Sequence, residues 1–223
     1  MHHTNDALAL PGQDEHGRAV AEPLDIQTDF SLTPTQLEEA ISNHVFEILS
    51  LLGYNTSDQH FKRTPERAAK VLMEFADRPD NVDAVRDLLE VSFHDAYDSL
   101  VQVGPVSVKS MCAHHMLPVY GHAWVGYLPD KRVCGLSKLA RVTDYFSRQF
   151  TVQERVTDLI ADALEYHLQP KGVMVVIKAI HGCMAHRGVQ EPQALTATSS
   201  VRGVFREEAD ARAEFLSLMQ PQR

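Results

Sequence analysis

The sequence predicts a protein of the α+β class, in which helices pack on one face of an antiparallel sheet. Apolar residues recur at helical spacing between residues 33 and 75 and again between 137 and 168. Between 99 and 128 the pattern changes to a period of two, and residues 173–180 form an almost continuous apolar, β-branched run. The first pattern is typical of amphipathic helices, and the second is typical of strands.

The N-terminal part of the chain is predicted to be a tail followed by helices. Residues 1–30 are polar and aperiodic. Thr33 to Gln36 form a helix start signal, and the helix is expected to end at Gly53. Thr64-Pro65 repeats the signal, and a short helix is expected from about 82 to 91. The apolar stripe of the first helix consists of Leu37, Ile41, Val45, Ile48 and Leu52. We therefore divide the chain into a tail (1–30), an N-terminal helical region (31–98) and a C-terminal region (99–223).

The C-terminal region begins with two strands that should pair antiparallel. Val101 to Val108 forms the first, with a break or bulge at Gly104-Pro105, and Val119 to Leu128 forms the second. The stretch from Ser110 to Pro118 connects them. The other predicted elements are two helices (about 137–149 and 152–168), two strands (173–180 and 195–204) and a closing helix (207–219).

Composition and charge exclude several classes of protein. The chain has 21 basic and 30 acidic residues, which is a formal net charge of −9. Such an acidic chain is a poor candidate for general binding of nucleic acid or membrane surfaces. No apolar run approaches the ~18 residues of a membrane-spanning helix, and the N-terminus lacks the apolar segment of a secretion signal. Because the three cysteines are an odd number, we expect reduced thiols and a cytoplasmic protein.

Two short stretches carry the residues of a candidate metal site, Cys112-Ala113-His114-His115 and His181-Gly182-Cys183. Together they offer two thiols and three imidazoles, a ligand set that suits zinc. Two thiolates and one imidazole would leave the fourth tetrahedral position to water, which is the pattern of a catalytic zinc. Such a water reaches a pKa near ~7 and becomes a nucleophile at neutral pH.

The spacing leaves the roles of the histidines open. Because adjacent residues of an extended segment point apart, either His114 or His115 could bind the metal while the other faces the substrate. His181 would share a face with Cys183 if the strand continues, which would place it near the ion as a general acid or base. The third cysteine, Cys134, is expected in the core. Taken singly, each of these residues is more often an ordinary buried cysteine or a hydrogen-bonded histidine.

Basic residues near these stretches indicate a polyanionic substrate such as a triphosphate. Lys138, Arg141 and Arg187 lie close to the proposed site in the sequence, and Arg67 lies in the first turn of a helix, where a cation does not benefit from the helix dipole. Glu154 follows Gln153 at the start of another helix, and its carboxylate could accept two hydrogen bonds from a planar edge such as guanine offers. Each of these residues could instead be a solvated surface group.

These residues occur in the order and spacing of a known family. From about Thr33 to Met219 the chain resembles the GTP cyclohydrolase I family. The matching stretches are Arg63–Arg67, Cys112–His115, Gly135–Leu139, Val152–Arg155, His181–Gly188, Thr196–Ser200 and Gly203–Phe205. The resemblance implies the tunnelling fold, in which antiparallel sheets from several subunits join into a barrel with helices outside. It also implies a ring-shaped homo-oligomer, commonly a decamer, with active sites between subunits.

The resemblance implies a role for each candidate residue. It implies a Zn²⁺ ion on Cys112, His115 and Cys183, with His114 and His181 as acid–base residues. Glu154, with Gln153, would hold the guanine edge of GTP, and Ser137 would contact the ribose region. Phosphates would be bound by Lys138, Arg141 and Arg187, and by Arg67 from a neighbouring subunit. The implied reaction opens the guanine ring between C8 and N9, releases formate and rearranges the ribose to give 7,8-dihydroneopterin triphosphate.

The chain departs from the family pattern at Ala113, where glutamate is usual, and at His122, where lysine is frequent. A carboxylate next to a metal ligand can orient that ligand and tune the metal. Two alternatives therefore stay open, a family member that stops at an earlier intermediate and a non-catalytic oligomer that binds purine nucleotides. A third is the nitrile reductase of the queuine pathway, which uses a cysteine nucleophile, but the complete Cys/His/Cys set argues against it. The motifs of zinc deaminases and of His-Glu-x-x-His proteases are absent from the sequence.

Overall fold

The computed structural model describes residues 32–76, 81–90, 92–94 and 97–219. The predicted tail and the last residue of the predicted short helix, Val91, lie outside the described residues. Within the described residues, none of the helices combines the length and the apolar character needed to span a membrane.

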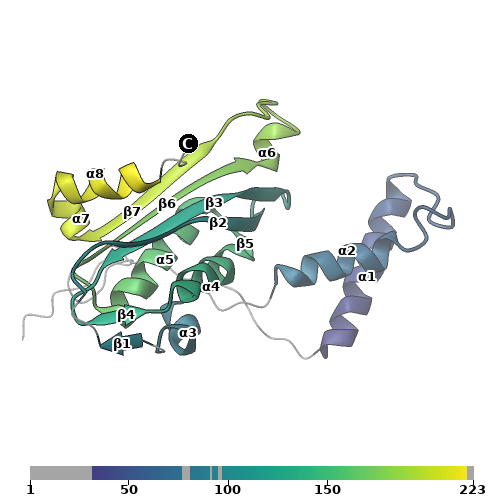
Figure 1. The fold of residues 1–223 in the computed structure, drawn as a ribbon. Coiled ribbons are helices and arrows are strands. Elements are labelled where there is room, and N and C mark those ends of the chain that lie inside the picture. The colour runs from purple at the N-terminus through teal and green to yellow at the C-terminus, as the bar shows by residue number, and fades with distance from the viewer. Residues whose placement is uncertain (1–31, 77–80, 91, 95–96, 220–223) are drawn as a thin grey trace, which may run out of the picture.

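The core of the molecule is a curled five-stranded sheet with the strand order β5-β2-β3-β6-β7 (Figure 1). Its long strands pair antiparallel, and only the short β5 runs parallel to β2. The predicted β2–β3 hairpin is confirmed, and its register shifts between Val103 and Val106, where the sequence predicts a break. The strands are β2 (Val101–Cys112), β3 (Pro118–Leu128), β5 (Phe150–Thr151), β6 (Gly172–His181) and β7 (Thr196–Gly203).

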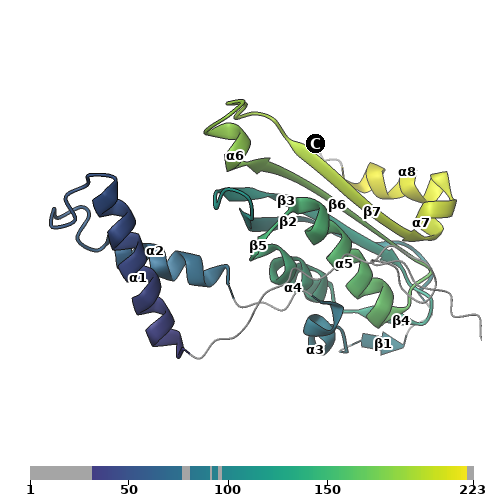
Figure 2. The same ribbon diagram turned by 180° about the vertical axis from the view of Figure 1, so that it is seen from behind.

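Helices cover both faces of this sheet, although the sequence predicts them on one face only. Helices α4 (Leu136–Ser147) and α5 (Gln153–Leu168) pack on one face, as Figure 2 shows. On the other face Phe205 of α7 (Val204–Glu207) and Phe215 of α8 (Ala209–Leu218) pack against β6. The reason is that the first half of β6 is apolar on both sides and buried throughout, so each face needs a covering layer.

A second, two-stranded sheet was not predicted. It joins β1 (Ser92–His94) to β4 (Arg132–Cys134), and three residues are too few to show a period in the sequence. The 3₁₀-helix η1 (Val82–Val85) and helix α3 (Arg86–Glu90) precede it. They lie against α5, where the ring nitrogen Nε2 of His167 donates to the backbone oxygen of Val82 at 2.7 Å. The division of the chain at residues 98 and 99 stays a prediction.

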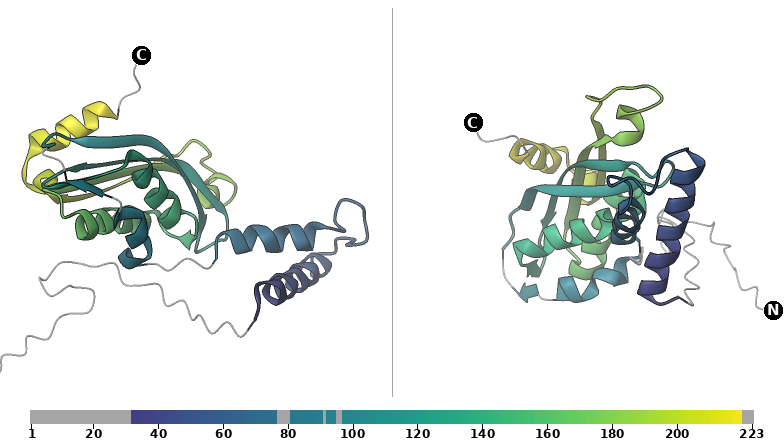
Figure 3. Two further views of the ribbon diagram at one scale, coloured as in Figure 1. Left: turned by 60° about the horizontal axis from the view of Figure 1, so that its bottom comes forward. Right: turned by 90° about the vertical axis from the view of Figure 1, so that its right-hand side faces the viewer.

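The first two helices form a hairpin that extends beyond the sheet (Figure 3). Helix α1 (Pro34–Leu51) begins with the predicted capping box between Thr33 and Gln36, and α2 (Thr64–Glu74) packs against it. However, no residue of α1 is buried in the described structure, and within the predicted stripe Ile48 is 55% and Leu52 67% exposed. The helix is amphipathic as predicted, but the described part of the chain covers only part of its apolar stripe, because Leu37, Ile41 and Val45 are half-buried whereas Ile48 and Leu52 are exposed.

Candidate active site

The two cysteine-containing stretches meet at one end of the sheet because β3 pairs with both β2 and β6. The register places Ser110, Val119 and His181 in one row across the three strands. Cys112 and Cys183 each lie two residues beyond this row, at the end of β2 and in the one-turn helix α6 (Gly182–Ala185). Residues 71 positions apart in the sequence are thus neighbours in space.

Cys112, His115 and Cys183 form a cluster that could hold a metal ion. One potential ligand atom from each lies within 4.8 Å of the other two. The Cys112 Sγ and His115 Nδ1 atoms are 3.8 Å apart. Ligand atoms around a tetrahedral zinc, bound at about 2.3 Å for sulfur and about 2.0 Å for nitrogen, are separated by about 3.5–3.8 Å. The donor set and its spacing therefore fit zinc.

The turn after β2 brings the ring of His115, and not that of His114, to the Cys112 thiol, a choice that the spacing alone leaves open. The backbone amides of His115 and Met116 both donate to the Cys112 oxygen, at 3.3 and 2.8 Å. This turn carries the His115 ring back towards the Cys112 thiol. The His114 ring is exposed and stands edge-on to the His115 ring, with 6.2 Å between the ring centroids.

The thiol of Cys183 is partly buried beside Cys112. Burial raises its pKa, and the hydrogen bond with Cys112 raises it further. A thiol must lose its proton to bind a metal, so metal binding at this cluster should release protons and weaken as the pH falls.

His181 is the last residue of β6 and lies two residues before Cys183. The shared strand face was expected only if the strand continued to Cys183, and this condition is not met, because β6 ends at His181 and α6 begins at Gly182. The ring is instead held by its Nε2 atom, 2.8 Å from the Gln153 Oε1 atom. Burial lowers the pKa of His181, and the nearby Glu154 carboxylate opposes this shift.

The two residues at the start of α5 differ sharply in their surroundings. The Gln153 side chain is buried, with 5% of its surface exposed, and its carboxamide bonds within the protein. Glu154 is exposed. Of the predicted phosphate ligands, Arg187 joins the cluster, because its Nη1 atom lies 2.8 Å from His115 Nε2.

The single chain does not bring the other predicted substrate ligands to this cluster. The C-terminal end of α4 lies beside it, since the Met111 amide donates to the Gln149 oxygen at 3.0 Å. Ser137 and Lys138 lie in the first turn of α4, and twelve helical residues span about 18 Å. The two residues before them, Gly135 and Leu136, help to line an open hollow of about 480 Å³. Arg141 is exposed one turn further along α4, and Arg67 is exposed in the separate α1–α2 hairpin.

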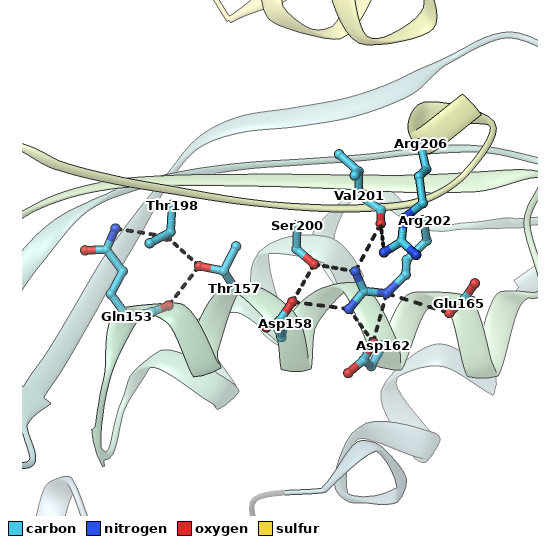
Figure 4. A network of polar contacts seen from close by, with 10 residues as sticks. All are labelled: Gln153, Thr157, Asp158, Asp162, Glu165, Thr198, Ser200, Val201, Arg202 and Arg206. Carbon is cyan, nitrogen blue, oxygen red and sulfur yellow. Dashed lines mark hydrogen bonds and ion pairs between the residues drawn. The ribbon is translucent and has the colours of Figure 1, made fainter. Parts of the chain in front are cut away.

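A polar network between α5 and β7 escaped the sequence reasoning (Figure 4). The Arg202 guanidinium lies 2.7 Å from an oxygen of Asp162 and 3.2 Å from one of Asp158, and it also donates to the Ser200 hydroxyl at 2.7 Å. A signal was available in the sequence. Asp158, Asp162 and Glu165 recur at helical spacing, while Ser200 and Arg202 alternate along a strand.

The fold and the cluster define an α+β protein with a candidate thiolate–imidazole metal centre at one end of its sheet. The family model described as GTP cyclohydrolase I matches residues 41–220. The chain therefore belongs to the GTP cyclohydrolase I family.

Relatives of the chain support this assignment. The GTP cyclohydrolase 1 of Chlorobium phaeovibrioides is 42% identical over 188 residues, which is 84% of each chain. The GTP cyclohydrolase 1 of Dictyostelium discoideum is 44% identical over 180 residues, which is 80% of this chain and 77% of that one. A structure of the archaeosine synthase QueF-Like in the apo form matches at 12% identity with a TM-score of 0.39. It covers 49% of this chain and 96% of that one. With so low a TM-score and identity, this match supports no conclusion about the chain. The chain is thus a GTP cyclohydrolase I enzyme, which argues against the nitrile reductase and the non-catalytic oligomer.

Proposed function

We propose that this chain converts GTP to 7,8-dihydroneopterin triphosphate and formate at a zinc ion held by Cys112, His115 and Cys183. The observation that carries the proposal is the convergence of two sulfur atoms and one imidazole nitrogen within 4.8 Å. Three protein ligands leave a coordination position open, which is the pattern of catalytic zinc sites. When bound, the zinc would act as a Lewis acid and activate water for hydrolysis of the guanine five-membered ring.

His114 and His181 are proposed to move protons to and from the reacting ring and the ribose. A neutral imidazole can take a proton and its conjugate acid can return it, which suits a reaction with several proton transfers. The lowered pKa of His181 supports a neutral ring at neutral pH, ready to act as a base. His114 is exposed beside the cluster, where a substrate can reach it.

Arg187 is proposed to bind a phosphate group once the metal is in place. Its Nη1 atom donates to His115 Nε2 at 2.8 Å, which requires a lone pair on that nitrogen. A zinc ion on Nδ1 would leave the ring proton on Nε2, so this hydrogen bond could not persist. The guanidinium would then be available for a bidentate contact with phosphate oxygens.

The substrate site is proposed to lie between subunits of a ring-shaped homo-oligomer, as in the tunnelling fold. In one chain Ser137, Lys138 and Arg141 lie along α4 away from the cluster, and the α1–α2 hairpin carries Arg67. A second chain that placed its α4 against this cluster would bring ribose and phosphate ligands to it, and would explain how a chain with a net charge of −9 binds a triphosphate. The exposed end of the apolar stripe of α1, at Ile48 and Leu52, supports further subunit contacts.

The direct test is incubation of the zinc-loaded protein with GTP. We expect formate release together with pterin fluorescence after oxidation. Formate without a pterin would favour the family member that stops at an earlier intermediate. If neither product forms while GTP stays bound, the proposed function is wrong.

Exchange of Glu154 for glutamine should weaken recognition of guanine. A carboxylate accepts both hydrogen bonds of the N1–H and 2-amino edge, whereas an amide oxygen accepts with less strength. We expect kcat/KM for GTP to fall by about 10- to 100-fold, the value of a charge-assisted hydrogen bond. The loss should be smaller for inosine triphosphate, which lacks the 2-amino group. Glu214→Gln, an exposed change on α8, is the control and should leave both substrates unaffected. An equal loss for both nucleotides would contradict the assignment of Glu154.

Mixed oligomers test whether the site is shared. The metal half of the proposed site is the cluster of Cys112, His115 and Cys183, and Cys183→Ser removes one of its residues. The phosphate half is formed by the basic residues of α4 from the neighbouring chain, and Lys138→Glu removes one of these. Each variant alone should be nearly inactive. When the two are co-expressed and assemble at random, about a quarter of the sites should combine two intact halves from adjacent subunits. Activity of the mixture that stays at the level of the separate variants would place both halves in one chain.

A further inference from the structure

The carboxamide of Gln153 lies where helix α5 packs against strands β6 and β7, and it is held there by hydrogen bonds. Its Nε2 atom lies 3.2 Å from the Ile177 oxygen, 3.2 Å from the Thr196 oxygen and 3.0 Å from the Thr198 Oγ1 atom. Its Oε1 atom lies 2.8 Å from His181 Nε2. Both ends of the amide therefore have protein partners in a buried position, and neither amide proton lacks an acceptor.

These contacts fix which way the amide points. Backbone carbonyl oxygens only accept hydrogen bonds, so the NH₂ group must face Ile177 and Thr196, and the oxygen must face His181. The opposite orientation would set the amide oxygen against two carbonyl oxygens. Because Oε1 itself only accepts, His181 Nε2 must be the donor and carry a proton. In the neutral ring, the lone pair then lies on Nδ1.

Two threonine hydroxyl groups hold the amide in place (Figure 4). Thr157 donates to the Gln153 backbone oxygen at 2.8 Å, and the two threonine Oγ1 atoms are 2.7 Å apart. Since the Thr157 proton is already used, Thr198 must donate to Thr157, and it accepts from the Gln153 amide. The three residues form a closed set of directional hydrogen bonds, so the amide cannot turn without breaking several of them.

We propose that Gln153 is a positioning residue for His181 and does not bind the guanine edge. It sets the orientation of the imidazole and keeps the proton on Nε2, which leaves the lone pair on Nδ1. Recognition of the guanine edge then falls to the exposed Glu154. The inference rests on the proposed acid–base role of His181, and it replaces the guanine contact that the resemblance implies for Gln153.

A double-mutant cycle tests this proposal through the separation of kcat from KM. Gln153→Met keeps the length of the side chain and removes all four hydrogen bonds. We expect kcat to fall by at least about tenfold, a part of the 10²–10⁴-fold contribution of an acid–base group. The KM for GTP should stay within about threefold of its original value. In a His181→Ala background, Gln153→Met should have almost no further effect on kcat, because the two residues act as one unit.

Other outcomes separate this inference from the function on which it rests. A raised KM with retained kcat, or an undiminished effect of Gln153→Met in the His181→Ala background, would overturn the positioning role and restore the guanine contact. Full activity of His181→Ala would overturn the acid–base role of His181 and the positioning role with it. Zinc content and the melting temperature of each variant show whether it has folded.

Thr198 offers a second measurement that does not depend on the folding of Gln153→Met. Thr198→Val removes the hydroxyl group that anchors the amide and that forms hydrogen bonds with Gln153 and Thr157. We expect kcat to fall by a few fold with an unchanged KM, and Thr198→Ser should restore it because the hydroxyl group returns. Equal activity of the valine and serine variants would contradict the proposal.

Discussion

Exchange of Cys183 for serine is expected to abolish metal binding and catalysis together. A serine hydroxyl is a poor zinc ligand at neutral pH, and Cys112 and His115 alone cannot complete the site. Loss of a residue that merely supports a ligand costs about 10–100-fold in metal affinity or activity, so loss of a ligand should cost more than about 100-fold. Zinc content by atomic absorption and formate release from GTP measure the two effects.

Cys134→Ser is the matched control for this prediction. Cys134 is buried and is the one cysteine outside the cluster. Its backbone amide donates a hydrogen bond to the Tyr127 hydroxyl. The variant should keep its zinc, although the new hydroxyl group in the core will reduce its stability. Unchanged zinc in Cys183→Ser would refute the metal centre, and lost zinc in Cys134→Ser would show that the assay reports on folding.

Exchange of Arg202 for methionine is expected to lower the free energy of unfolding more than any of the other exchanges proposed for this protein. The Arg202 side chain is 14% exposed and lies within 4 Å of carboxylate oxygens of Asp158, Asp162 and Glu165. Removal of the guanidinium leaves the three carboxylates close to one another where α5 packs against β7, with no positive charge between them. Breaking a buried ion pair from one side costs about 3–5 kcal/mol, and partial exposure of the acids favours the lower end. For a domain of this size, a loss of about 3 kcal/mol corresponds to a melting temperature lower by about 6–12 °C.

The pH dependence of this loss identifies its cause. Burial raises the pKa of Asp162, and the Arg202 guanidinium opposes that shift. Without the guanidinium the folded protein would bind this proton still more tightly than the unfolded chain does. The deficit of Arg202→Met is therefore fully present at a pH where the Asp162 carboxyl is ionised in both proteins, and it shrinks as the pH falls through the raised pKa of that carboxyl, which lies above the ordinary value of about 4. Arg206→Met is the control, because Arg206 is exposed and donates to a backbone oxygen. A deficit that did not change with pH would point to lost packing instead.

The sequence by itself predicted the elements whose causes are local. The capping box at Thr33 is set by residues three positions apart, and the β2–β3 hairpin follows from alternation along each strand. The same holds for the core position of Cys134. The sequence also shows which types of ligand are present, thiols and imidazoles, but it leaves open which histidine joins the two cysteines. Missed elements such as β1 and β4 are too short to carry a period, and their pairing is a contact between distant segments.

Only the tertiary structure decided how these residues meet. The turn after β2 selects His115 over His114, and the end of β6 at His181 places its ring on Gln153 and not on a shared face with Cys183. Sequence spacing does not report such choices, because they depend on the pairing of β3 with two strands and on α5 packing across them. The same packing buries Gln153, leaves Glu154 exposed and sets Lys138 a helix length from the cluster. Local periodicity therefore determined the elements and residue identity determined the ligand types, whereas contacts between distant segments decided which atom faces which.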